Sequence, residues 1–154
     1  MTNAQAYNAM IAPEKLLSVS NLVDATIEDL TAAGEAVENA YGERASLVKA
    51  IVQLEGAIQL TEAEAFMQID EKNGVIVDDK PVKLANSEMR DMYRRYVSRD
   101  LRKELTEKQA DLKEIEIHIF KAKERYDESK VVADMVIAKA YVQANLLKFL
   151  AGRD

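Results

Sequence analysis

The chain has 154 residues, a formal net charge of −6 and a hydrophobic fraction of 48%. This length and apolar content are those of one ordinary folded domain, and they exclude a wholly disordered chain. The chain has no cysteine, which excludes disulfide frameworks, thiolate metal sites and cysteine nucleophiles and is compatible with a reducing cytoplasm. With five glycines and two prolines the chain is poor in turns, so it favours a few long helices.

Neither targeting nor a membrane is indicated. The N-terminus has no basic region followed by an apolar stretch, so we predict no secretory signal peptide. A membrane span needs about 18 consecutive apolar residues, and the sequence contains no such run. We therefore expect a cytoplasmic protein without a membrane partner.

Charge is distributed unevenly along the chain. Residues 14–79 contain 14 acidic and 4 basic residues, whereas residues 80–103 contain 8 basic and 3 acidic ones. The remainder of the chain, from residue 104, is close to neutral. A basic centre beside an acidic half predicts either an anionic partner or contact between these segments of two subunits.

The first half of the chain is predicted to be helical after a short arm. Residues 1–13 carry no charge and are expected to form a flexible arm. Residues 14–69 show apolar residues at alternating spacings of three and four, the pattern of a helix with one buried face. The expected stripe contains Val23, Ile27, Leu30, Gly34, Val37, Tyr41, Arg44, Val48 and Ile51. The sequence leaves open whether Gly42 breaks this helix, which is long enough to require a partner helix.

Residues 70–85 change in character and predict a small β-hairpin. Asn73-Gly74 is a turn signal, and the β-branched run at residues 75–77 follows it. A second turn at residues 78–81 separates this run from Val-Lys-Leu at residues 82–84. Two such strands are too small to be stable alone. We expect the hairpin to lie at the turn between two helices or to pair with the same element of another subunit.

Residues 86–151 are predicted to form the second long helix, with a kink expected, if anywhere, near residues 103–108. Asn86 or Ser87 is placed to cap its start. From residue 131 to residue 150 the segment is apolar on more than one face, which predicts subunit contacts. The residues assigned to the oligomer interface are Val132, Val136, Ala140, Leu147 and Leu150.

These elements define one fold. We predict a single all-α domain: a long antiparallel, coiled-coil-like helical hairpin with a small β-hairpin at the turn, assembled as a homo-oligomer.

Catalytic and metal motifs are missing from the sequence. His118 is the one histidine, and its spacing from Glu114 does not give the paired Glu-x-x-His motifs of di-iron bundles. Asp70 lacks the ladder of ligands that a calcium loop needs. The chain contains no P-loop, dinucleotide-binding or serine-hydrolase motif. We therefore predict no enzyme, no catalytic residue, no metal, no cofactor and no small-molecule substrate.

The basic segment carries the sharpest functional signal. On a helix its arginines fall on one broad side and its tyrosines and methionines on the other. Guanidinium groups bind phosphates through two parallel hydrogen bonds, and tyrosines can stack on bases, so the segment predicts binding of single-stranded DNA. The residues assigned to nucleic-acid binding are Lys80, Lys83, Arg90, Arg94, Arg95, Arg99, Arg102 and Lys103. Two alternatives stay open: a solvated face whose arginines pair with acids, and contact with the acidic half of another subunit.

The order of elements resembles that of the UvsY-like recombination mediators of phages. The similar features are Ser-Glu-Met-Arg at 87–90, Ser-x-Asp at 98–100 and Phe-Leu-Ala-Gly at 149–152. The resemblance implies a ring-forming phage protein, in the host cytoplasm, that binds single-stranded DNA. It also implies partnership with a RecA-like recombinase and with single-strand-binding protein. The residues that would contact DNA are Lys83, Arg90, Arg94, Arg95 and Arg99.

A helix–hairpin–helix order is also similar to that of prefoldin-type chaperone subunits. In those proteins the hairpins join into a barrel and the helices extend as coiled coils with apolar ends. Phe149 and Leu150 could serve as such an end. A third alternative is an inhibitor or adaptor that acts by protein–protein contact only, for which the sequence offers no test.

Overall fold

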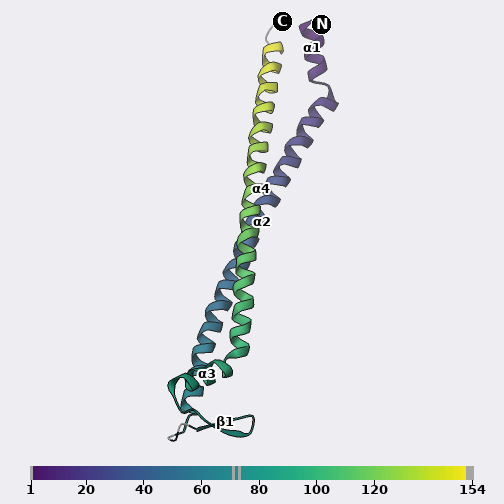
Figure 1. Cartoon of the computed structure of the whole chain (residues 1–154). Coiled ribbons are helices and arrows are strands. Elements are labelled where there is room, and N and C mark those ends of the chain that lie inside the picture. The colour runs from purple at the N-terminus through teal and green to yellow at the C-terminus, as the bar shows by residue number, and fades with distance from the viewer. Residues whose placement is uncertain (1, 71, 73, 152–154) are drawn as a thin grey trace. The chain divides into compact units, whose positions relative to one another are not determined.

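The computed structural model confirms the predicted fold class, an all-α helical hairpin with a small β-hairpin between its two long helices (Figure 1). The structure describes residues 2–70, 72 and 74–151. The elements are α1 (Asn3–Met10), α2 (Pro13–Met67), β1 (Gly74–Val77), β2 (Lys80–Lys83), α3 (Ser87–Val97) and α4 (Arg99–Ala151). No helix in the described part of the chain combines the length and apolar content that crossing a membrane requires.

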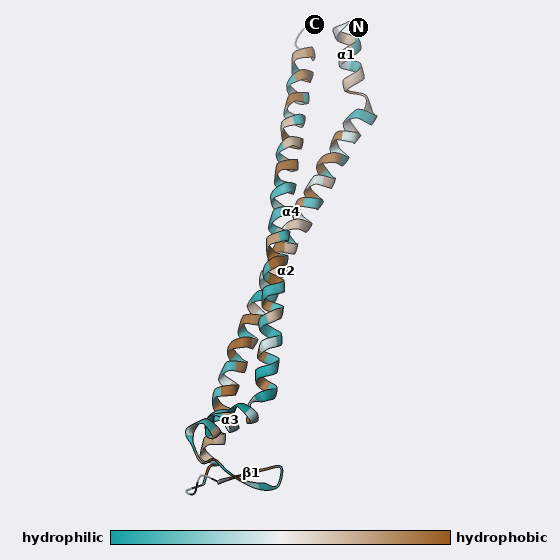
Figure 2. Cartoon of the chain, in the orientation of Figure 1, coloured by the Kyte–Doolittle hydropathy of each residue, from teal (hydrophilic) through white to brown (hydrophobic). Residues whose placement is uncertain are grey.

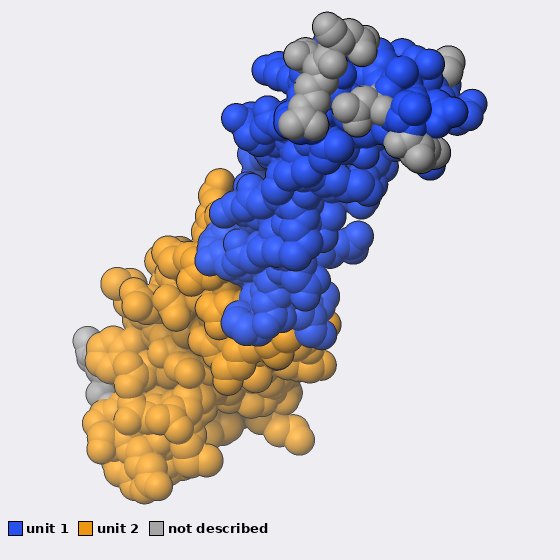
Figure 3. All heavy atoms as spheres, turned by 90° about the horizontal axis from the view of Figure 1, so that it is seen from above, with its two compact units in different colours: residues 1–41, 118–154 blue, residues 42–117 orange. Residues whose placement is uncertain are grey.

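The chain divides into two compact units (Figure 3). Unit 1 comprises the described residues of 1–41 and 118–154, and unit 2 comprises those of 42–117. Both α2 and α4 contribute residues to each unit. Within each unit, therefore, a part of α2 packs against a part of α4.

In unit 1 the packed faces of α2 and α4 follow a heptad pattern. Buried and half-buried positions recur at spacings of three and four residues, as in a coiled coil, and hydrophobic residues recur along both helices in Figure 2. On α2 these positions are Val19, Val23, Thr26, Leu30, Ala33, Val37 and Ala40. On α4 they are Ile119, Ala122, Tyr126, Ser129, Ala133, Val136, Ala140, Gln143, Leu147 and Leu150.

The stripe predicted for α2 is partly wrong. Ile27 and Tyr41 are exposed, at 58% and 42%, whereas Ala33 and Ala40 are buried. The Tyr126 ring of α4 covers Gly34, since a Cβ on Gly34 would lie 3.6 Å from this ring, an ordinary contact distance. Small residues on the packed face of α2 leave room for side chains of α4, and larger residues lie beside this face.

The segment predicted to be a flexible arm contains a helix instead, α1. Thr2 and Gln5 form a capping box: the Gln5 N–H donates to Thr2 Oγ1 at 3.3 Å, and the Thr2 N–H donates to Gln5 Oε1 at 3.0 Å. α2 then begins at Pro13, a position that tolerates proline because the first helical N–H has no intrahelical partner. The capping box and the proline are short signals, and α1 is too short for a periodic apolar pattern that would have predicted it from the sequence.

The structure shows where the long helices are continuous. α2 continues through Gly42, where the sequence left a break open. α4 is continuous over residues 103–108, and the break in the second half of the chain lies at Ser98, between α3 and α4, where the sequence predicted one long helix. The Ser98 N–H donates to the Arg94 carbonyl at 3.1 Å, and the Ser98 carbonyl accepts from the Arg102 N–H at 3.0 Å. One residue therefore joins the two helices.

The core of unit 2 lies where the end of α2, the β-hairpin and α3 meet. Ala65, Val75, Leu84 and Tyr93 form a buried cluster, and Ile69, Val77 and Val82 pack against it. A two-stranded hairpin is marginal alone. Here its inner face gains stability by covering α3 and the last turn of α2.

The β-hairpin lies in the predicted segment, but its turn has two residues and β2 is Lys80–Lys83 instead of residues 82–84. Val75 pairs with Val82 and Val77 with Lys80, so Asp78 and Asp79 form the turn, with φ of 49° and 62°. Asn73 of the predicted first turn lies outside the described residues. The loop into β1 is held by Asp70, whose Oδ1 accepts from the Lys72 N–H at 2.8 Å and from the Gly74 N–H at 2.6 Å.

The turn predicts a stabilising substitution. Two successive positive φ angles are the geometry of a type I′ turn, whose second central residue is preferably glycine. Asp79→Gly should raise the free energy of unfolding by about 0.5 kcal/mol, because glycine adopts this conformation without the side-chain clash that aspartate meets. Asp79→Val should lower it. Urea denaturation followed by circular dichroism measures both, and a loss of stability in the glycine variant would contradict the assigned turn.

Candidate binding groove and basic surface

A polar cluster holds the junction of α3 and α4 against α2 in unit 2. Glu62 Oε1 accepts from Ser98 Oγ at 2.8 Å, from Arg102 Nε at 3.1 Å and from Arg102 Nη2 at 2.5 Å. Ser98 is fully buried, so its hydroxyl needs this partner. The Arg102 hydrogen bonds lower the pKa of the Glu62 carboxyl below its ordinary value, against a smaller opposing effect of burial. These three side chains fix the start of α4.

Several of the predicted nucleic-acid-binding residues are engaged by acids of their own chain. All eight lie in unit 2. Arg102 is bound to Glu62, and Arg94 forms an ion pair with Asp91 within α3. Arg90 is half-buried. The predicted alternative in which arginines pair with acids therefore holds for Arg94 and Arg102.

Two further cations have weak or exposed partners. Lys103 Nζ lies 4.0 Å from Glu107 on the surface of α4. The Arg99 guanidinium lies 4.3 Å from the centroid of the exposed Tyr96 ring. A side-chain hydrogen bond with Tyr96 raises the pKa of Arg99 above its ordinary value. Arg99 Nε also lies 3.7 Å from Asp100. Exposed ion pairs of this kind are worth less than about 1 kcal/mol, so both cations can exchange partners.

The lysines of the β-hairpin do not share one face. Lys80 is paired with Val77, and directly opposed residues project to the same side of a sheet, so Lys80 lies on the inner face with Val82. Lys83 follows Val82, and successive residues of a strand project to opposite faces, so Lys83 lies on the outer face with Ile76. Both lysines are exposed. Within the described residues, neither has an ion pair, and neither does Arg95.

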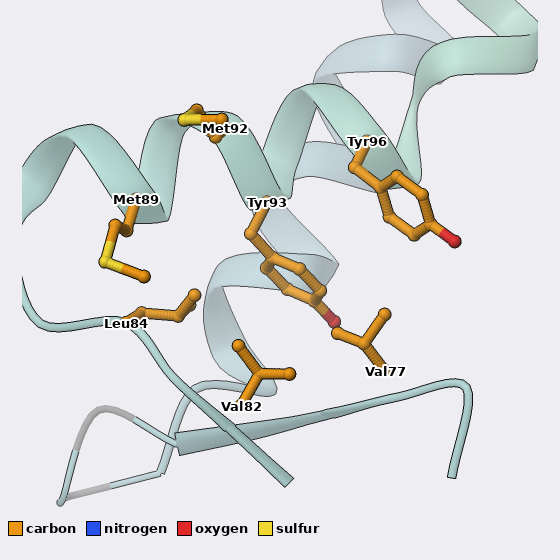
Figure 4. A pocket seen from close by; sticks show the side chains of 7 residues that line it. All are labelled: Val77, Val82, Leu84, Met89, Met92, Tyr93 and Tyr96. Carbon is orange, nitrogen blue, oxygen red and sulfur yellow. The ribbon is translucent and has the colours of Figure 1, made fainter. Parts of the chain in front are cut away.

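An apolar groove of about 260 Å³ runs between α3 and the inner face of the β-hairpin (Figure 4). Its lining residues are Val77, Val82, Leu84, Met89, Met92, Tyr93 and Tyr96. The α3 residues among them share one helical face because they are spaced by three and four positions. Tyr93 forms the buried part, and its hydroxyl donates to Gln68 Oε1 at 3.4 Å.

The sequence prediction missed the groove, although it placed the tyrosines and methionines of this helix together on one side. Only Tyr93 is buried, whereas Met92 is 64% exposed and Tyr96 41%. The hairpin offers α3 only a few apolar residues, Val77, Val82 and Leu84. The apolar face of α3 is wider than the few apolar residues of the hairpin can cover, and comparing the two in the sequence could have shown that part of this face stays exposed.

In unit 1 the predicted oligomer residues fall on two different faces of α4. Val136, Ala140, Leu147 and Leu150 occupy the heptad face that packs within the chain. Val132 is exposed. The exposed face that it belongs to also contains Val131, Met135, Val142, Leu146 and Phe149.

Metal-binding geometry is not found in the described part of the chain. Among those residues, no group of three or more histidines, aspartates or glutamates could hold a metal ion. The geometry instead offers two kinds of surface that can bind: an apolar groove bordered by cations in unit 2, and an apolar helix face in unit 1.

The cluster around Glu62 predicts a pH-dependent stability. Because its pKa is lower in the folded state, the carboxylate contributes stability above its ordinary pKa of 4.5 and loses it as the pH falls through the folded-state pKa. Glu62→Gln should reduce the free energy of unfolding by about 1 kcal/mol at pH 7 and by less at pH 3. Urea denaturation at both pH values, with Glu64→Gln as the control, measures the difference. An equal loss at both pH values would argue against the assigned role.

No family model, no curated protein and no solved structure matches this chain. The resemblances to recombination mediators and to prefoldin subunits therefore remain expectations from short sequence features and element order. What the chain binds has to be inferred from the surfaces described above.

Proposed function

We propose that the chain is a non-enzymatic accessory protein that binds single-stranded DNA through unit 2. The observation that carries this proposal is the exposed Tyr96 ring stacked with the Arg99 guanidinium, beside the exposed Arg95. Aromatic rings and guanidinium planes both stack on unpaired bases, and arginines bind the phosphates between them. A sequence-independent contact with a single strand requires little more than these groups.

The proposed track is narrower than the eight residues of the sequence prediction. Arg94 and Arg102 already pair with acids, and Lys83 lies on the outer face of the hairpin. The exposed cations that remain near Tyr96 are Lys80, Arg95, Arg99 and Lys103. Four phosphate contacts would give a slope of about −3 in a plot of log affinity against log salt.

The biological setting of the proposal comes from the resemblance to phage recombination mediators. A protein of that class would act in the host cytoplasm as an oligomer, together with a RecA-like recombinase and single-strand-binding protein. The features that support this setting are the short motifs beginning at Ser87 and Ser98.

The DNA proposal predicts a large effect of charge reversal. Arg95→Glu with Arg99→Glu should weaken binding of a fluorescent oligothymidine at least 100-fold at low salt, because two attractive contacts become repulsive. Fluorescence anisotropy over a salt series measures it. The matched control is Lys113→Glu with Lys121→Glu, which makes the same change of net charge on exposed positions of α4. Equal losses in the two variants, or no binding by the wild type, would refute a specific track.

We also propose that the exposed apolar face of α4 forms a homo-oligomer. The face contains Val131, Val132, Met135, Val142, Leu146 and Phe149, exposed between 45% and 66%. Single exposed apolar residues are ordinary, but a continuous patch of more than about 400 Å² usually marks an interaction surface. The interface between subunits would then lie on the side of α4 next to its heptad face, whereas four of the five residues predicted from the sequence lie on the heptad face itself.

The oligomer proposal is tested by polar substitution on this face. Met135→Ser with Val142→Ser should reduce the mass in solution to that of one chain, because both side chains lose their buried contacts between subunits. Ile137→Ser with Tyr141→Ser is the control, since these residues are equally exposed on another side of α4. Light scattering after size exclusion gives the mass. A wild-type protein that is already monomeric would refute the proposal.

The same exposed face favours a second candidate function, a prefoldin-like chaperone. An exposed apolar stretch near one end of a long helix can hold unfolded polypeptide instead of a second subunit. In that case Met135→Ser with Val142→Ser would leave the mass unchanged and abolish suppression of client aggregation. The two readouts therefore separate the two uses of this face.

A further inference from the structure

We propose that the groove between α3 and the β-hairpin binds an amphipathic helix of another protein, one with acidic residues beside its apolar stripe. This site is additional to the DNA track, although the two share cations at their borders. Its floor is the buried Tyr93, and its walls are the hairpin valines and the methionines of α3 (Figure 4).

The groove in unit 2 is lined by apolar side chains that are partly exposed to solvent. Met92 is 64% exposed and Met89 37%, so the two methionines are not covered by unit 2 itself. Methionine side chains are flexible and polarisable, and they adapt to different apolar partners. An exposed tyrosine and two exposed methionines around an apolar hollow form a surface that gains free energy when it is covered.

The edges of the hairpin disfavour a bound strand. Val77 and Lys80 flank the two-residue turn, so their N–H and C=O groups point toward each other across the hairpin. The main-chain groups of the next residue, Pro81, therefore point away from β1, to the free edge of β2. Proline has no N–H to donate, which interrupts that edge. On β1 the outward N–H and carbonyl of Gly74 are already bonded to Asp70, at 2.6 Å and 3.0 Å. Of the outward-facing main-chain groups, those of Ile76 and Lys83 are left, one residue on each edge. Recognition therefore depends mainly on side chains that fill the groove.

The spacing of the groove residues matches a helix. Met89, Met92 and Tyr96 recur at three and four positions along α3, which is 11 residues long and so about 16 Å. A partner helix can place apolar side chains at positions i, i+4 and i+7 between them, as one helix packs on another. A stretch of about three turns would cover the groove.

The charges at the border favour an acidic partner. Lys80 lies on the same face of the hairpin as the lining valines, Arg95 follows Met92 by one helical turn, and Arg99 stacks on Tyr96. Of the nearby acids, Asp91 is paired with Arg94, and Asp78 lies 3.5 Å from the Tyr96 hydroxyl, which donates to it. Asp100 lies 3.7 Å from Arg99, and the exposed Asp79 precedes Lys80 in the turn. Glu88 lies at the other end of the groove, in the first turn of α3.

A second copy of the chain fits the groove less well. Its exposed apolar face on α4 contains one charged residue, Lys139, which lies in line with Val132 and Leu146 because it is seven residues from each. That face would bring positive charge to a positive border, which costs free energy. Complementary charge therefore argues against this α4 face as the occupant of the groove.

The test uses the full chain and a synthetic probe. The probe is a fluorescein-labelled 16-residue helical peptide with leucine at positions i, i+4, i+7 and i+11, glutamate beside the leucines and alanine elsewhere. A peptide with lysine in place of each glutamate is its matched control. We expect the acidic peptide to bind at least tenfold more tightly than the lysine peptide, and Arg95→Glu with Arg99→Glu to reverse this order.

The decisive variant is Met89→Asn with Met92→Asn, which should weaken the acidic peptide at least tenfold. Both residues are exposed, so circular dichroism should show an unchanged fold. Ile76→Asn makes the same kind of change on the outer face of the hairpin and should have no effect. Equal binding by the methionine variant, or equal binding of the two peptides, would overturn the proposal. A mass in solution that falls in the methionine variant would show that a second copy occupies the groove.

The methionine variant also separates this site from the DNA track. It should bind oligothymidine as the wild type does, because it leaves Tyr96 and every proposed cation in place. Loss of both ligands would show that the groove and the DNA track are one site and would overturn the proposal of a separate peptide site.

Discussion

The hydrogen bonds that Glu62 accepts from Ser98 and Arg102 are the contact on which unit 2 depends. Ser98 is the single residue between α3 and α4, and it is buried with its hydroxyl on the Glu62 carboxylate. Arg102 closes the same cluster from the first turn of α4. Because the chain changes direction here, α3 lies over the end of α2 and the β-hairpin instead of continuing α4. Without that change of direction the groove would have no second wall.

The same contact decides how the basic segment is used. One arginine is bound to Glu62, a second pairs with Asp91, and a third stacks on Tyr96. The surface that remains is therefore a few exposed cations beside an aromatic ring and an apolar groove. A single strand of DNA and an acidic helix would use these groups differently, since DNA needs the ring and the charges while a helix also needs the methionines.

Unit 1 follows another constraint, the packing of α4 against a face of α2 that contains small residues. Ala33, Ala40 and Gly34 lie on or beside the packed face of α2, so larger residues are left on the outer sides of the helices. On α4 this leaves an exposed apolar face, which includes Met135 and Val142. Both functions proposed for unit 1 would use this face.

The sequence by itself determined the two long helices, the position of the hairpin and the basic centre of the chain. These features depend on neighbours a few residues apart, through apolar spacing, turn chemistry and local charge. Only the tertiary structure decided that Thr26 and Ala33 line the packed face in place of Ile27, that the helix breaks at Ser98, and that Arg102 pairs with Glu62. Each of these outcomes depends on residues far apart in the chain, 40 positions apart for Arg102 and Glu62. For this reason the basic segment, which the sequence predicted to lie on one helix, spans the junction of α3 and α4. It contributes one wall of the groove and a charged surface smaller than predicted.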